Sequence, residues 1–116
     1  MKLTLCGVWT ENNQNHPIYM NNTTHELVCD MGDKGKYFLT NLMVDSSGLE
    51  DTEEESADDF TSMYPMYNAT GLIYTVTHTI ALHNDYTADI YDNDELSIIA
   101  TVPFSMDIKV DSTYKE

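Results

Sequence analysis

Acidic side chains are the most numerous groups in this chain that could do chemistry, and they gather in two stretches. Seven of the ten residues from 50 to 59 are acidic, and residues 85–95 mix carboxylates with tyrosines. Carboxylates at such density could bind a cation, exchange protons in catalysis or present negative charge to a basic surface. Each of these uses makes different demands on the neighbouring residues.

Metal binding is the first use, and the spacing argues against it. Asp92, Asp94 and Glu95 could supply oxygen ligands to Ca²⁺, but this stretch lacks the glycine and the spacing of an EF-hand loop. A solvated turn is therefore the better interpretation. The four histidines follow no zinc-site spacing either, so we expect no metal and no cofactor.

Nucleophilic catalysis would need a motif that the chain does not contain. Ser47 and Gly48 lack the preceding glycine of a hydrolase elbow, and no basic residue flanks Cys6 or Cys29 to lower its pKa. Acid–base chemistry cannot be argued from spacing, since any two of the 20 carboxylates could meet. We therefore predict a protein that is not an enzyme.

The balance of charge indicates the kind of partner. The chain has 20 acidic residues, five lysines and no arginine, which gives a net charge of -15. This exceeds the roughly 2–8 units that solubility alone requires of a small domain. Arginine is the usual ligand of phosphates and base edges, so direct binding to nucleic acid or to an anionic membrane is disfavoured. A basic protein surface is the expected partner.

Nucleic-acid mimicry is the specific hypothesis that this charge favours. Carboxylates two residues apart along a strand lie about 6.8 Å apart on one face, close to the separation of successive phosphates. Tyrosines between them would add contact area and specificity. The predicted partner-binding residues are Glu50, Asp51, Glu53, Glu54, Glu55, Asp58, Asp59, Tyr64, Tyr67, Asp85, Tyr86, Asp89, Tyr91, Asp92, Asp94 and Glu95.

A structural role is the alternative to mimicry. The protein would then be a small assembly module of a virion or oligomer, with its contacts carried by the edges of a sheet. The negative charge would in that case only prevent aggregation. A homodimer is a further expectation about its partners.

In size, acidity and lack of a catalytic motif, the chain resembles the small acidic inhibitors made by phages and plasmids. Anti-restriction DNA mimics and some anti-CRISPR proteins are examples. The resemblance lies in composition and transfers no individual site residue. It implies a stoichiometric blocker of a host defence nuclease, acting in the host cytoplasm, that binds where DNA or guide RNA would lie.

Period-two alternation predicts the elements that must position these residues. Apolar residues at even positions predict a long half-buried strand over 71–82 and another over 96–110, with a bend, bulge or edge at Pro103. A polar turn is expected over residues 11–17. Shorter strands are predicted over residues 2–10, 18–20, 27–29, 36–44 and 87–91. Residues 36–44 are apolar on both parities, so an early helix is the alternative there.

The acidic segment 46–70 is expected to be flexible or partly helical. A short helix over 52–63 is predicted because Thr52 and Glu55 have capping-box spacing, although a disordered acidic loop is nearly as well supported. The whole chain, 1–116, is then one α+β domain, predominantly β, with an antiparallel twisted sheet. The absence of a signal peptide or transmembrane run predicts a cytoplasmic protein with free thiols.

Overall fold

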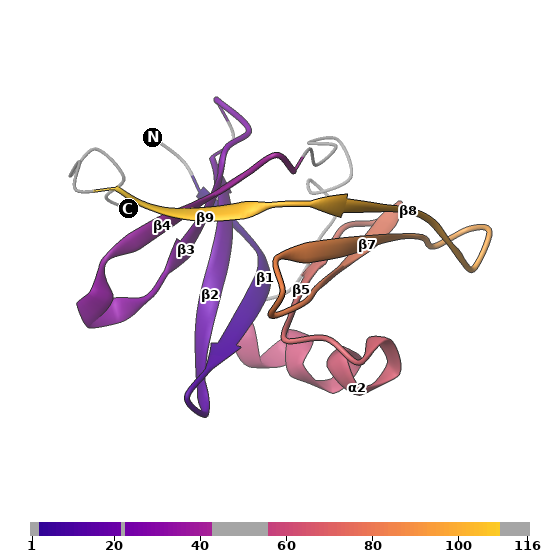
Figure 1. Ribbon diagram of the computed structural model, residues 1–116, viewed down its shortest axis with the longest axis horizontal. Helices are drawn as coiled ribbons and strands as arrows, with labels where there is room; N and C mark the ends of the chain where they lie inside the picture. The colour runs from indigo at the N-terminus through magenta and orange to yellow at the C-terminus, as the bar shows by residue number, and fades with distance from the viewer. Residues whose placement is uncertain (1–2, 22, 43–55, 110–116) are drawn as a thin grey trace.

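The alternating apolar residues form one antiparallel sheet of nine strands that nearly closes into a barrel (Figure 1). This computed structural model describes residues 3–21, 23–42 and 56–109. The strands are β1 (Leu3–Glu11), β2 (Gln14–Asn21), β3 (Leu27–Asp30), β4 (Lys36–Thr40), β5 (Gly71–Tyr74), β6 (His78–Leu82), β7 (Thr87–Asp92), β8 (Ser97–Pro103) and β9 (Ser105–Lys109). Their order across the sheet is β8-β7-β6-β5-β1-β2-β3-β4-β9. The prediction of a predominantly β, antiparallel fold is confirmed.

The last two strands explain why the sheet nearly closes. Phe104 alone separates β8 from β9, yet β8 pairs with β7 while β9 pairs with β4 at the other end of the sheet. Figure 1 shows the two strands as one nearly straight stretch across the molecule. Pro103 is the last residue of β8, so the interruption predicted there is present, and it lies in an edge strand.

The β1–β2 hairpin is tighter than the sequence analysis predicts. Only Asn12 and Asn13 form its turn, and both have positive φ angles, of 54° and 64°. Two such residues give the turn whose twist matches that of the flanking strands, and asparagine tolerates this conformation. His16 and Pro17 belong to β2 instead, paired with Trp9 and Val8, so the seven-residue turn over 11–17 is wrong.

The predicted strand over 71–82 is two strands, β5 and β6, joined by a tight turn. Thr75 closes this turn, because its N–H donates to the carbonyl of His78 at 2.8 Å and its Oγ1 accepts from the N–H of His78 at 3.0 Å. Both faces of the hairpin are buried: Leu72, Ile73 and Ala81 are at most 1% exposed. The prediction of one long, half-buried strand is therefore wrong.

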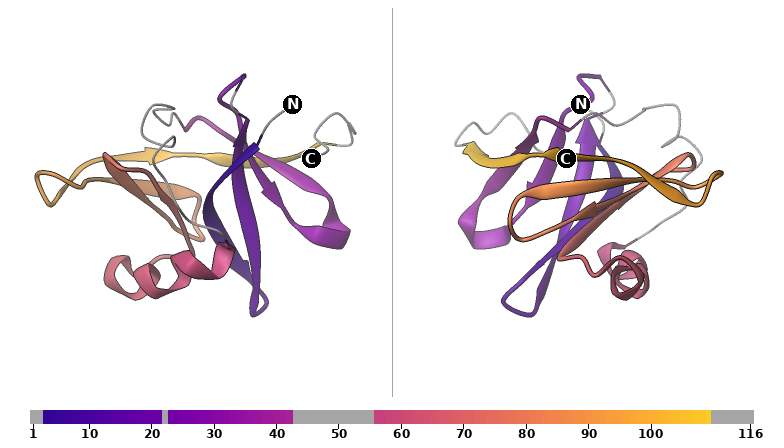
Figure 2. Two further views of the ribbon diagram at one scale, coloured as in Figure 1. Left: turned by 180° about the vertical axis from the view of Figure 1, so that it is seen from behind. Right: turned by 45° about the vertical axis from the view of Figure 1, so that its right-hand side comes forward.

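A helical segment covers one outer face of the sheet (Figure 2). It consists of a 3-10 helix, η2 (Ala57–Met63), followed by a short α-helix, α2 (Tyr64–Tyr67); a second 3-10 turn, η1 (Gly32–Lys34), precedes β4. Phe60 is fully buried and packs with Val8 of β1 and Leu72 of β5. This outer cluster is separate from the main core inside the barrel.

The predicted acidic helix over 52–63 is not confirmed. Its described part begins later, at Ser56, whose Oγ accepts from the N–H of Asp58, while the carboxylate of Asp59 accepts from the N–H of Ser56. Ala57, Phe60 and Met63, which all pack on the outer cluster, are three residues apart, the period of a 3-10 helix. Residues 52–55, with the predicted capping pair, lie outside the described residues.

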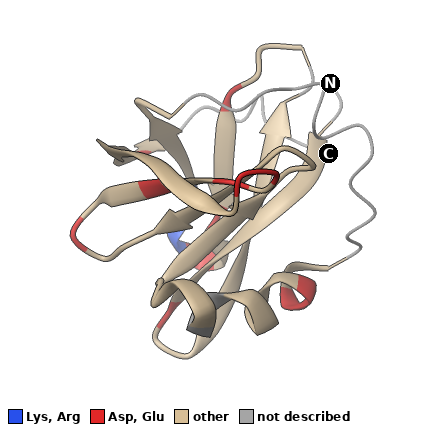
Figure 3. Ribbon diagram, turned by 90° about the vertical axis from the view of Figure 1, so that its right-hand side faces the viewer, with Lys and Arg blue, Asp and Glu red and all other residues tan. Residues whose placement is uncertain are grey.

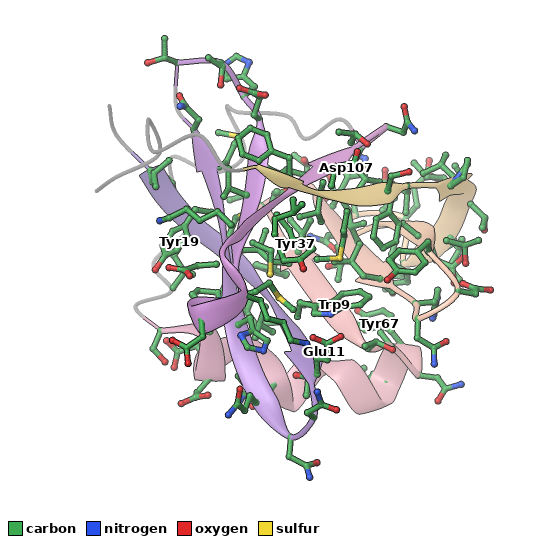
Figure 4. The ribbon with its side chains drawn as sticks, turned by 60° about the vertical axis from the view of Figure 1, so that its left-hand side comes forward. Trp9, Glu11, Tyr19, Tyr37, Tyr67 and Asp107 are labelled. Atoms are coloured by element: carbon green, nitrogen blue, oxygen red, sulfur yellow. The ribbon has the colours of Figure 1, made fainter. Side chains whose placement is uncertain are left out.

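The main core fills the barrel and holds both cysteines. Trp9, which is labelled in Figure 4, belongs to this core. It packs edge-on against Phe104, with ring centroids 6.2 Å apart. Cys6 and Cys29 are buried free thiols, as predicted. Burial raises the pKa of Cys29 to about 12, with smaller contributions from nearby carboxylates, and burial raises the pKa of Cys6 further. Neither thiol is a nucleophile at neutral pH.

Candidate protein-interaction surface

The predicted partner-binding residues fall in several different places. Glu50, Asp51, Glu53, Glu54 and Glu55 lie outside the described residues. Asp58 and Asp59 begin the helical segment, and Tyr64 and Tyr67 belong to α2. The remaining seven lie along β7 and in the turns at its two ends. These seven are Asp85, Tyr86, Asp89, Tyr91, Asp92, Asp94 and Glu95.

An apolar groove lies between α2 and the outer face of β6, β7 and β8; we call it the outer groove. It has a volume of about 300 Å³ and is lined by Met66, Tyr67, Ala81, Asp89, Tyr91 and Ile98. Tyr67 and Tyr91 meet edge to face, with ring centroids 5.4 Å apart. The fold therefore brings together three predicted residues from two distant segments: Tyr67, Asp89 and Tyr91.

A β-bulge explains why Ile98 lines this groove. Ile90 pairs with Ala100, but its neighbour Tyr91 pairs with Ile98, so Ile99 is an extra residue in β8. A one-residue shift reverses which face the side chains occupy, so Ile98 lies on the outer face beside Tyr91. Ile98 is 56% exposed. Unbroken alternation in the sequence predicts the opposite face for Ile98.

The expectation that the even positions of 96–110 are buried is wrong at both ends of this stretch, and the bulge accounts for the end before Ala100. Only the middle of this stretch contacts the core: Phe104 is buried, and Val102 and Met106 pack against the core as partly buried residues. Leu96 and Ile108, at its two ends, are 70% and 55% exposed. The β8 end of the stretch therefore presents apolar side chains to solvent.

Among the described residues, Asp89 is the one carboxylate that lines the outer groove. Its Oδ1 accepts from the hydroxyl of Thr101 at 2.7 Å, and its Oδ2 lies 2.9 Å from Nε2 of His83. These two hydrogen bonds, that of Thr101 first, hold the pKa of Asp89 below its usual value. The groove thus carries a fixed negative charge at neutral pH.

The β7–β8 turn presents two more predicted carboxylates, Asp94 and Glu95. Both are exposed, and both N–H groups donate to Oδ1 of Asp92 at 2.9 Å. These hydrogen bonds, that of Glu95 first, lower the pKa of Asp92. Asp92 therefore stabilises the turn, and Asp94 and Glu95 carry the charge that a partner would contact.

The β6–β7 turn lies at the other end of β7. Asp85 accepts from both the N–H and the hydroxyl of Thr87, and the hydroxyl contact chiefly lowers the pKa of Asp85. Tyr86 stacks on Trp9 at 6.2 Å but is still 48% exposed. β7 (Thr87–Asp92) therefore separates Asp85 and Tyr86 at one of its ends from Asp94 and Glu95 at the other.

Asp58 and Asp59 also have partners within the fold. Asp58 accepts a hydrogen bond from Asn15 of β2 at 2.7 Å, which ties the start of η2 to the β1–β2 hairpin. Asp59 caps the segment through Ser56. Both residues are exposed, so they combine a local structural contact with a charge on the surface.

A second depression, missed by the sequence analysis, lies beside the β1–β2 hairpin. This acidic cleft has a volume of about 800 Å³, and Glu11, Asp30, Asp33 and Asp58 are among its lining residues. Lys34, which also lines it, pairs with Glu11 at 3.0 Å, and this contact raises the pKa of Lys34. No sequence pattern indicated the cleft, because its residues come from three separate segments.

The surface charge of the described residues is dominated by carboxylates, many of them on turns (Figure 3). Lys34 and Lys36 each pair with a carboxylate, Glu11 and Asp30 respectively. Among the described residues, no three side chains of the metal-ligating types gather into one group. No helix in the described part is both long and apolar enough to cross a membrane.

The chain has no detectable relatives in the comparisons with known proteins. No protein-family model matches it, and neither a curated protein nor a solved structure matches it. The function must therefore be argued from the surface itself.

Proposed function

We propose that this protein is a non-enzymatic interaction protein that binds the basic, nucleic-acid-binding surface of another protein. The observation that carries the proposal is the outer groove. It joins exposed apolar and half-buried aromatic side chains to a fixed carboxylate, Asp89, on a chain with a net charge of -15.

Charge and groove would contribute different parts of the binding free energy. The acidic surface accelerates encounter with a basic partner and repels nucleic acid, which is itself anionic. Met66, which is 81% exposed, and the Tyr67–Tyr91 pair offer adaptable apolar contact area for the bound state. A partner engaged in this way could not hold DNA or RNA at the same time. A phage-type inhibitor of a host defence nuclease, such as a CRISPR effector or a restriction enzyme, would act by this mechanism.

The first test is retention of nucleic-acid-binding proteins from host-cell lysate on the immobilised chain. We expect a basic protein to be retained at about 0.1 M salt. DNA or RNA should displace it, and so should about 0.5 M salt, where the Debye length is roughly halved. Retention that resists both competitors would contradict the proposal.

Two matched double variants locate the surface. Asp94→Lys with Glu95→Lys should reduce retention several-fold, because it reverses the charge of the β7–β8 turn. Glu26→Lys with Asp33→Lys makes the same change in net charge elsewhere on the surface and should retain the partner better. Equal losses in both variants would show that net charge alone, and not this surface, determines binding. Thermal unfolding checks that each variant folds.

A further inference from the structure

The edge of β8 that faces away from β7 is a second surface, and one of its described residues, Ile98, also lines the outer groove. In the described part of the chain, β8 pairs with β7 on one side only. Its residues Ser97–Thr101 are all exposed, with Ile98 at 56% and Ile99 at 50%. An exposed apolar strand with an unpaired edge is a template for another strand.

The strand at the other end of the sheet, β9, carries charge, whereas β8 carries none. Asp107 places a charge within its five residues, and charged residues on an edge strand oppose pairing. From Leu96 to Met106 the chain carries no charged residue at all. The two ends of one sheet therefore differ in charge, while the bulge at Ile99 and Pro103 are the edge-protecting features that β8 has.

We infer that β8 pairs with β8 of a second copy of this chain, in antiparallel orientation. The distribution of charge favours a second copy of the chain over a basic partner at this edge. A basic partner would gain no electrostatic attraction at β8, whereas two copies that each carry a net charge of -15 can approach closely only where carboxylates are absent. A two-fold axis through the edge makes such a contact self-complementary.

The antiparallel orientation also separates the acidic turns. Asp94 and Glu95 precede β8, so in a parallel pair the two turns would lie side by side. In an antiparallel pair, the seven residues of β8 hold them about 20 Å apart, more than twice the Debye length at physiological salt. The pairing keeps like charges from meeting.

Pro103 sets the limit of the paired segment. The N–H of Phe104 donates to the carbonyl of Tyr86, on the β7 side. Because neighbouring N–H groups in a strand point to opposite sides, the missing N–H of Pro103 faces the free edge. Pairing therefore covers Ser97 to Val102, a short interface that predicts a dimer of modest affinity.

The test is sedimentation equilibrium from micromolar to near-millimolar protein. We expect the mean mass to rise from the 13.2 kDa of the monomer towards twice that value. Ile99→Lys should lower the association constant at least tenfold, because it places a charge at the paired edge. Ile108→Lys is the matched control: it changes an isoleucine of similar exposure on β9, and the dimer should persist.

Amide hydrogen exchange gives a second readout on the unmodified chain. Protection of residues 97–102 should increase with protein concentration, while protection of β9 should not. A chain that stays monomeric throughout the range would overturn the inference. So would a dimer that survives Ile99→Lys and is lost in Ile108→Lys. Neither result bears on the outer groove, which Ile99 does not line.

Discussion

Asp89 links the outer groove to the edge strand at the scale of a single residue. Its carboxylate is held by Thr101 of β8 and His83 beside β6. The hydrogen bonds lower its pKa in the folded state, so folding favours the ionised form. The resulting stabilisation is fully present above the unfolded pKa, about 3.9, and is lost as the pH falls through the lowered folded value.

Asp89→Asn should therefore be less stable than the unmodified chain at pH 7, and the difference should shrink as the pH falls below about 4. Urea unfolding at several pH values measures both free energies of unfolding. Asp94→Asn is the control, since that carboxylate lies in the exposed turn. A difference for Asp89→Asn that stays constant with pH would show that the carboxylate is not held as described.

Gly7 is a second residue whose substitution should change the stability of the fold. It pairs with Ile73 of β5, and a methyl group there would come within 2.9 Å of Cα of Ile73 and closer still to the carbonyl oxygen of Leu72. Because both obstacles are backbone atoms, no side-chain rotation relieves the clash. Gly7→Ala should cost at least about 1–3 kcal/mol in the free energy of unfolding, measurable by urea denaturation. Gly32→Ala is an informative comparison, since no atom lies within 4 Å of the added methyl group, although its φ of 67° adds strain.

At the scale of an element, the side chain of Phe60 does most to hold the helical segment to the sheet. Phe60 is fully buried between β1 and β5, so Phe60→Ala should cost roughly 3–5 kcal/mol. The same change loosens the wall of the outer groove that carries Met66 and Tyr67, so partner retention should fall too. Phe60→Leu, which keeps most of the volume, should lose much less of both. Retention that survives Phe60→Ala in a folded protein would show that the groove is not used.

The elements also show where sequence patterns carry information. The three-residue spacing of Ala57, Phe60 and Met63 is visible in the sequence, and it matches the 3-10 helix better than the α-helix that the capping pair predicts. The extra residue at Ile99 gives no signal in the sequence, because Ile98 and Ile99 are both good strand formers. Only the pairing with β7, which is a tertiary contact, reveals the bulge and exposes Ile98.

At the scale of the whole molecule, the sheet could be predicted and its closure could not. Alternation locates most strands because each has one face in a core. It also predicts one-sided burial for 71–82, which fails because the helical segment covers the opposite face. The outer groove combines residues from α2, β6, β7 and β8, so its parts could be proposed from the sequence but their meeting could not.

The position of β8 and β9 in the chain has a consequence for synthesis on the ribosome. These strands complete both ends of the sheet, yet they are the last part of the described chain to be made. Until they emerge, β7 and β4 each lack a neighbour, and their open edges can pair with other nascent chains. The final fourteen described residues therefore complete both ends of the sheet at once. A chain that stops before Leu96 should aggregate in the cell.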